Sequence, residues 1–120
     1  MQAYYNMEER LININETTIR EFVESMRPED PEIRNQLDFG YSFDGSVIEI
    51  FEIRPQWNDP TKIHNSPFAR IRFYKSKNLW KLYWKRANGK WELYEPFPSA
   101  THLSRILKII DEDDYGCFKG

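Results

Sequence analysis

Two turn-forming dipeptides, Asp44-Gly45 and Asn88-Gly89, restrict the fold of this chain more than any other feature of the sequence. Each stands between short runs in which apolar and polar side chains alternate, and this alternation has the period of a β-strand. Asp-Gly and Asn-Gly also favour the tight turns that join antiparallel neighbours. The sequence therefore predicts two β-hairpins, one around each dipeptide.

The position of a turn fixes which residues of its two strands lie opposite one another. A weaker turn signal, Lys77-Asn78, adds a further hairpin between the other two. Because strand side chains alternate between the faces of a sheet, this register separates residues 70–94 into an apolar side and a side rich in cations and tyrosines. The expected pairs are Phe43 with Ser46, Phe73 with Leu82, Ala87 with Lys90, Trp84 with Leu93 and Tyr83 with Tyr94.

Apolar residues at helical spacing predict two helices that flank the strands. The first helix is expected to begin at a capping box formed by Asn13 and Glu16 and to end at Arg27, before a proline. The second is expected to begin at Ser99 or Thr101. The apolar stripe of each helix needs a sheet face to cover. The stripes are Ile19, Phe22, Val23 and Met26 in the first helix, and Leu103, Ile106, Leu107 and Ile110 in the second.

These elements together predict an α+β fold. We expect an antiparallel meander sheet of about five strands, with the N-terminal and C-terminal helices packed on one face. A chain of 120 residues fits a single domain over residues 1–120. The first ten residues have no clear period, and residues 1–12 are treated as an N-terminal extension that could be mobile.

The segment 55–68 is expected to be a loop, because it contains three prolines. A small-molecule pocket beneath this loop remains open as an interpretation. Large aromatic side chains usually fill the core of a small domain, so the tryptophans are assigned there by default. They are Trp57, Trp80, Trp84 and Trp91, the last of which could also stack on Arg86 across its turn.

Basic side chains are concentrated in one stretch, although the net charge of the chain is −2. Residues 60–91 contain nine Lys or Arg and no Asp or Glu. Such an asymmetry points to an electrostatic partner. On the predicted sheet, many of these cations lie on the face that the helices leave uncovered, with Tyr94 beside them. The basic face, as we call it, consists of Arg70, Arg72, Tyr74, Lys81, Tyr83 and Lys85.

A basic face that also carries tyrosines suggests binding of single-stranded RNA or DNA, because cations hold phosphates and aromatic rings stack on bases. An ordinary solvated face, partly neutralised by carboxylates such as Glu49, is the simpler interpretation. The main functional alternative is a protein-interaction or self-assembling module, in which an acidic run of one copy meets the basic face of another. This run is Asp111, Glu112, Asp113 and Asp114.

The sequence contains few motifs typical of an enzyme, and no catalytic residue, metal site or cofactor is assigned. His64 and His102 have no histidine or cysteine at the spacing of metal ligands. Glu52 is expected to form an ion pair at the sheet border, either with Arg54 or across to a neighbouring strand, rather than to belong to a nuclease metal site. A metal-free ribonuclease is a weaker alternative. Its candidate groups are Lys81, Tyr83, Arg70 and Arg72.

Composition and apolar runs bear on the cellular setting. A single cysteine excludes an internal disulfide framework and fits a reducing compartment. The longest apolar runs are far shorter than the roughly 20 residues that a membrane-spanning helix needs. The N-terminus is acidic and does not look like a secretion signal. We therefore expect a cytoplasmic protein without a membrane partner.

Four motifs in fixed order add a family resemblance. They are E-I-R-P-x-W at 52–57, W-x-L-Y-W at 80–84, N-G-x-W at 88–91 and D-E-D-x-Y-G-x-F at 111–118. With these motifs the chain resembles the bacterial family called domain of unknown function 3024, over roughly residues 37–120. The resemblance implies a bacterial, single-domain, cytosolic protein. It implies no catalytic role for any residue, because the family carries no assigned activity.

Overall fold

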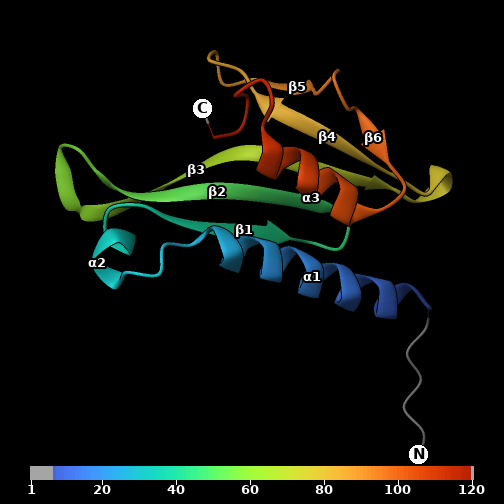
Figure 1. The fold of residues 1–120 in the computed structure, drawn as a ribbon, viewed down its shortest axis with the longest axis horizontal. Helices are drawn as coiled ribbons and strands as arrows, with labels where there is room; N and C mark the ends of the chain where they lie inside the picture. The colour runs from blue at the N-terminus through green and yellow to red at the C-terminus, as the bar shows by residue number, and fades with distance from the viewer. Residues whose placement is uncertain (1–6, 120) are drawn as a thin grey trace, which may run out of the picture.

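The computed structural model describes residues 7–119 and shows an open antiparallel sheet with helices on one side (Figure 1). The strand order is β1-β2-β3-β4-β5, and a short strand β6 pairs with β4. The predicted α+β class is therefore confirmed. In chain order the elements are α1 (Met7–Met26), α2 (Pro31–Arg34), β1 (Asp38–Phe43), β2 (Val47–Gln56), β3 (Asp59–Tyr74), a 3₁₀ turn (Lys75–Lys77), β4 (Leu79–Lys85), β5 (Trp91–Leu93), β6 (Ser99–Ala100) and α3 (Leu103–Glu112).

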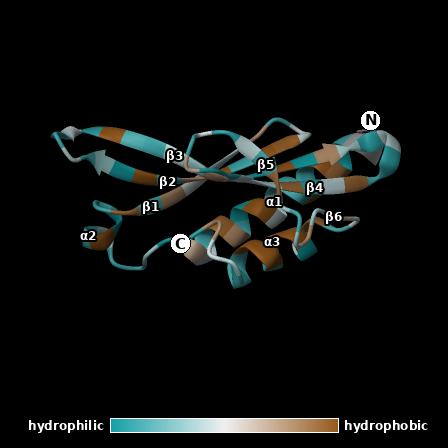
Figure 2. Cartoon of the chain, turned by 90° about the horizontal axis from the view of Figure 1, so that it is seen from above, coloured by the Kyte–Doolittle hydropathy of each residue, from teal (hydrophilic) through white to brown (hydrophobic). Residues whose placement is uncertain are grey.

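The core lies between the sheet and the two long helices, α1 and α3, which cover the same face (Figure 2). Every residue of the predicted stripe in α3 is buried. Burying a large aliphatic side chain stabilises the fold by roughly 1.5–3 kcal/mol relative to leaving it in water. The side chains with no exposed surface include Ile19 of α1, Ile48 and Ile50 of β2, Ile71 of β3, Leu82 of β4, and Ile106 and Ile110 of α3.

Helix α1 begins at Met7, earlier than the predicted cap at Asn13. The hydroxyl of Thr17 donates to the carbonyl of Asn13 at 3.1 Å, so Asn13 already lies within the helix. Residues 7–12 are mostly good helix formers and continue the helix towards the N-terminus. That part of the expected extension belongs to α1, and residues 1–6 lie outside the described residues.

Helix α3 begins at Leu103, later than either predicted start. Ser99 and Ala100 form strand β6, with Ala100 opposite Trp80 of β4. His102 is the N-terminal cap residue and makes no side-chain capping bond. The polar residues that suggested a helix start are therefore used at the sheet edge and in the connection to the helix.

The turn between β1 and β2 is centred on Gly45 and Ser46, one residue later than predicted. The carboxylate of Asp44 accepts two backbone N–H groups of the turn, at 2.9 and 2.7 Å, and holds it in this position. Gly45 has a φ of 100°, which favours glycine. Phe43 pairs with Ile48 instead of Ser46. A register change of two residues leaves every side chain on its predicted face.

The register between β3 and β4 also differs from the prediction by two residues. The 3₁₀ turn and Asn78, which has a φ of 50°, connect the two strands. Phe73 therefore pairs with Trp80 instead of Leu82. The predicted faces of both strands are preserved, because the register again changes by two residues.

The turn between β4 and β5 contains three residues, 87–89, where two were predicted. Gly89 supplies the left-handed conformation that such a loop needs, with a φ of 82°. Tyr83 consequently pairs with Leu93 instead of Tyr94. A one-residue change turns every side chain of β5 to the other face. Tyr94, predicted on the basic face, is 2% exposed in the core, and Leu93 shares the face of Tyr83.

The proline-marked segment predicted to be a loop is a two-stranded ribbon. Strands β2 and β3 remain paired as far as Gln56 and Asp59, and Trp57 and Asn58 form the turn between them. Trp57, assigned from the sequence to the core, is 95% exposed at this turn. The loop assignment and the core assignment of this tryptophan were therefore wrong.

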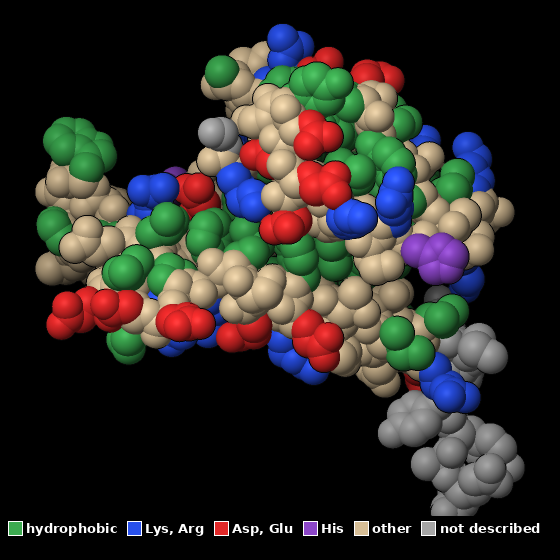
Figure 3. Space-filling model, viewed as in Figure 1, with side chains coloured by type: hydrophobic (Ala, Val, Ile, Leu, Met, Phe, Trp, Pro, Cys, Tyr) green, Lys and Arg blue, Asp and Glu red, His purple; other side chains and the backbone are tan. Residues whose placement is uncertain are grey.

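This ribbon extends past the strands on either side of it, and we call residues 54–66 the arm. Strand β1 pairs with β2 no farther than Ile53, and β4 pairs with β3 no farther than Ala69. In the space-filling view the arm stands away from the body, with apolar surface at its end (Figure 3). Pro55 and Pro60 are tolerated there because a strand with a free edge does not need their missing N–H groups.

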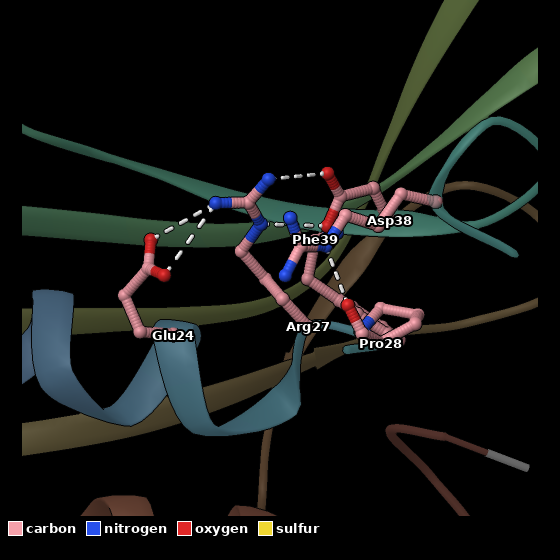
Figure 4. A network of polar contacts seen from close by, with 6 residues as sticks. Glu24, Arg27, Pro28, Asp38 and Phe39 are labelled. Carbon is pink, nitrogen blue, oxygen red and sulfur yellow. Dashed lines mark hydrogen bonds and ion pairs between the residues drawn. The ribbon is translucent and has the colours of Figure 1, made fainter. Parts of the chain in front are cut away.

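Arg27 connects the end of α1 to the start of β1 (Figure 4). Its Nε and Nη2 donate to the two carboxylate oxygens of Asp38 at 2.9 and 3.0 Å, and its Nη1 donates to Glu24 at 3.2 Å. Two parallel bonds fix the relative orientation of the side chains as well as their distance. The Arg27 guanidinium also lowers the pKa of the Asp38 carboxyl from its ordinary value of 3.8.

Asp38→Asn is expected to lower the melting temperature by a few degrees at neutral pH, because it removes the charge that Arg27 binds. A carboxyl whose pKa is lowered by folding stabilises the protein above its unfolded-state pKa, and this contribution is lost as the pH falls through the folded-state value. Melting curves of the two proteins should therefore converge below pH 3.8. Glu24→Gln, at the more exposed partner, is the control and should change little. A constant difference across the acid range would contradict this account.

Candidate functional site

Antiparallel pairing brings the residues of the basic face together on β3 and β4. Arg70 lies opposite Tyr83, and Arg72 lies opposite Lys81. Directly opposed side chains share a face, and Tyr74 and Lys85 follow from the alternation of each strand. Helices α1 and α3 lie on the other side of the sheet (Figure 2). Within residues 7–119, no helix covers the basic face.

Trp91 is a residue of this face that the sequence did not place there. The three-residue turn pairs it with Lys85 instead of Arg86. The Arg70 guanidinium carbon lies 4.7 Å from the centre of the indole, and the Lys85 ammonium nitrogen lies 5.8 Å from it. The available signal was Gly89, because a three-residue hairpin loop with a left-handed glycine is the common competitor of a two-residue turn.

Tyr74 forms a second aromatic centre on the basic face. The Lys81 ammonium lies 4.9 Å from the centre of its ring and the Arg72 guanidinium carbon 5.4 Å from it. Its hydroxyl oxygen is 2.7 Å from that of Tyr83. Each cation–π contact at such an exposed site contributes roughly 0.5–1 kcal/mol. These contacts restrain long side chains that would otherwise move freely, so the cations are held in place before a ligand arrives.

Tyr83 is suited to hydrogen bonding and poorly suited to proton transfer. Its burial raises its pKa to about 12, and the hydrogen bond with Tyr74 acts in the same direction. A phenol with this pKa keeps its proton at neutral pH and can donate a hydrogen bond. A general base needs a pKa near the working pH. The arrangement therefore gives little support to proton abstraction by Tyr83.

One carboxylate neutralises part of the basic face. Arg70 donates to a single oxygen of Glu49 from Nη2 at 2.6 Å and from Nε at 2.9 Å. For the remaining cations, no carboxylate of the described residues lies within ion-pair distance. The face thus keeps a net positive charge. These unpaired cations are Arg72, Lys81 and Lys85.

The acidic run 111–114 is largely engaged within its own chain. Asp113 has a φ of 47° and ends helix α3. Its carboxylate accepts the backbone N–H groups of Phe118 and Lys119 at 3.0 and 2.7 Å. The run therefore caps the helix and holds the C-terminal segment. Its ion pairs are Asp111 with Lys119 at 3.4 Å and Glu112 with Lys108 at 3.9 Å.

Metal binding and membrane-spanning helices have no support in the part of the chain that the structure describes. Residues 7–119 contain no group of three or more His, Cys, Asp or Glu that could hold a metal ion. None of the helices described is long and apolar enough to cross a membrane. Glu52 and Arg54 form the predicted ion pair, with an oxygen of Glu52 3.1 Å from the Nε of Arg54.

Comparison with models of protein families identifies the family of the chain. The model of a family described as Domain of unknown function (DUF3024) matches residues 7–120. The match begins well before residue 37 and includes helix α1 as well as all the strands. No curated protein and no solved structure matches the chain.

Proposed function

The chain belongs to the DUF3024 family, and because membership assigns no activity, we propose from its geometry that it is a small non-enzymatic module whose basic face binds single-stranded RNA or DNA. One observation carries the proposal. An uncovered sheet face holds Arg72, Lys81 and Lys85 without carboxylate partners among the described residues and against aromatic rings. Cations fixed in this way neutralise phosphates, and guanidinium and aromatic planes stack on unpaired bases.

Single strands suit this surface better than a duplex does. In a duplex the base faces are stacked on one another, so aromatic rings on a protein surface cannot reach them. Tyr74 and Trp91 each lie beneath two cations, which leaves the outer planes of Arg70 and Arg72 for stacking. The hydroxyls of Tyr74 and Tyr83 add hydrogen-bonding capacity between those cations.

The alternatives have less support from the same contacts. Assembly through the acidic run would compete with its bonds to the C-terminal segment and to Lys108. A metal-free ribonuclease would need another group than Tyr83 to take a proton, because the pKa of Tyr83 is about 12. The cellular setting that belongs to the proposal is the bacterial cytoplasm, as the family resemblance implies.

Binding to labelled single-stranded oligomers, followed by fluorescence anisotropy, is expected to weaken steeply with salt. With three phosphates neutralised, the logarithm of the affinity should fall with the logarithm of the salt concentration with a slope of about −2. A tenfold rise in salt then weakens binding about 100-fold. A duplex of the same sequence should bind less tightly.

The same titration contains the outcomes that would overturn the proposal. Absence of binding to RNA and DNA oligomers at low salt would refute a nucleic-acid interface. Shortened oligomers after incubation would show a nuclease instead of a binding module. A protein mass that rises with concentration, without oligomer binding, would favour assembly.

A further inference from the structure

The tip of the arm contains a hollow that the basic face does not explain. Its volume is about 420 Å³, which lies within the range of small-molecule sites. We propose that this hollow binds the base of a nucleotide, with Trp57 as the stacking platform, at a site separate from the basic face. Its lining residues are Arg54, Pro55, Gln56, Trp57, Asn58 and His64.

Trp57 presents an indole that the fold does not use. It is 95% exposed, so it contributes almost no buried surface to the core. The turn that carries it is closed by the pairing of Gln56 with Asp59, and the Asp59 carboxylate accepts the backbone N–H and the hydroxyl of Thr61 at 3.2 and 2.6 Å. Because the backbone beneath the indole is already fixed, stacking of a ligand needs to order only the side chain of Trp57. Planar bases are the ligands that stack on exposed aromatic rings in this way.

The polar groups around the indole match the edge of a base. Gln56 and Asn58 flank Trp57 in the turn, and their side chains make no hydrogen bond with any residue in 7–119. A carboxamide offers a donor and an acceptor side by side, which complements the N6 and N7 groups of adenine. A purine base also offers more area for stacking than a pyrimidine. We therefore expect adenine nucleotides to be preferred.

Arg54 lies across the ribbon from His64, and directly opposed residues share a face. Its Nε donates to Glu52 at 3.1 Å, and its terminal nitrogens have no hydrogen-bond partner among the described residues. They remain able to donate to a phosphate. The carboxylate of Glu52 offsets the charge of this arginine, so the phosphate adds less to binding here than on the basic face. The hollow should consequently show a weak salt dependence.

The ligand group proposed for the hollow is a planar base beside a phosphate. A free nucleotide and a nucleotide within a single strand both contain this group. Adenosine monophosphate and a short oligoadenylate distinguish these sources as probes. Equal affinity per site would identify a free nucleotide. Tighter binding of the oligomer, sensitive to the arm variants below, would identify a base within a strand.

The test is a titration of the whole protein with adenosine monophosphate, followed by NMR. The indole N–H signal of Trp57 and the side-chain amide signals of Gln56 and Asn58 should shift and reach saturation. Trp57→Ala and Asn58→Ala should each weaken binding about tenfold. Ile63→Ala is the matched control, because Ile63 is a 61% exposed arm residue that does not line the hollow. It should bind like the unchanged protein.

Several outcomes would overturn the inference. Signals that do not shift, or that shift without saturating, would show that the hollow binds no nucleotide. Equal losses in Trp57→Ala and Ile63→Ala would show a nonspecific surface effect. Shifts that depend on protein concentration in the absence of nucleotide would identify a second copy as the occupant. A Lys81→Glu, Lys85→Glu double variant should still bind the mononucleotide, so failure of the basic-face proposal would leave this site unaffected.

Discussion

Replacing Lys81 and Lys85 together by glutamate is expected to weaken binding of single-stranded nucleic acid about 100-fold or more. Lys81 lies over Tyr74 and Lys85 lies over Trp91, so both changes alter the centre of the basic face. Each substitution removes one of the cations proposed to contact phosphates and adds a negative charge that would repel the nucleic-acid backbone. The remaining unpaired cation, Arg72, cannot compensate for two repulsive neighbours. Anisotropy at low salt, with circular dichroism to verify folding, measures the effect.

A matched variant separates the basic face from net charge. Arg105 and Lys108 are exposed residues of α3, on the helix-covered side of the sheet. Changing both to glutamate alters the protein charge by the same amount as the Lys81 and Lys85 changes. The affinity of this double variant for single-stranded nucleic acid should fall only slightly, because salt screens charges that lie far from the ligand. Equal losses in the two double variants would mean that overall charge, and not the basic face, attracts the ligand.

Phe118→Ala is expected to reduce the free energy of unfolding by about 3–5 kcal/mol, a large part of the stability of a small domain. Phe118 is 4% exposed, and its ring centre lies 5.0 Å from that of Tyr94. The truncation leaves a cavity beside Tyr94 and weakens the docking of a segment that is otherwise held by bonds to Asp113. Urea unfolding followed by circular dichroism gives the difference in free energy.

Tyr115→Ala provides the comparison within the same C-terminal segment. Tyr115 is 70% exposed, so its truncation should change stability by no more than about 0.5 kcal/mol. Similar effects of the two substitutions would show that Phe118 is not part of the core. That result would also question the face on which Tyr94 lies, because the two rings pack against each other.

The observed turns explain why the sequence placed the side chains of most strands on the correct face of the sheet and those of β5 on the wrong one. Turn dipeptides identify where a hairpin reverses but leave its centre uncertain by a residue. At the Asp44 and Asn78 turns the observed register differs from the predicted one by two residues, so each side chain stays on its predicted face. At Gly89 it changed by one, which exchanged Leu93 and Tyr94 between the faces. The faces of β3 and β4 were therefore predicted correctly, whereas the face of Trp91 on β5 was not.

The arm shows a different limit of sequence reasoning. Prolines argue against a strand only where a neighbour needs the missing N–H group. Whether such a neighbour exists depends on how far β1 and β4 extend, which no local pattern in the arm reveals. Trp57 was assigned to the core because large aromatic side chains usually fill the core of a small domain, and the local sequence does not show that it lies at an exposed turn. The hollow beside it consequently became visible only in three dimensions.

The two free edges of the arm also bear on aggregation. An exposed strand edge normally invites another chain to add to the sheet, and proteins block such edges with prolines and charges. Pro55 and Pro60 interrupt the row of N–H groups that an incoming strand would need, and Arg54 and Lys62 keep the ribbon charged. These residues are expected to limit the edge-to-edge pairing of arms from different copies. A molecule that recognises the tip of the arm is therefore expected to contact mainly its side chains, because Pro55 and Pro60 each remove a backbone donor there.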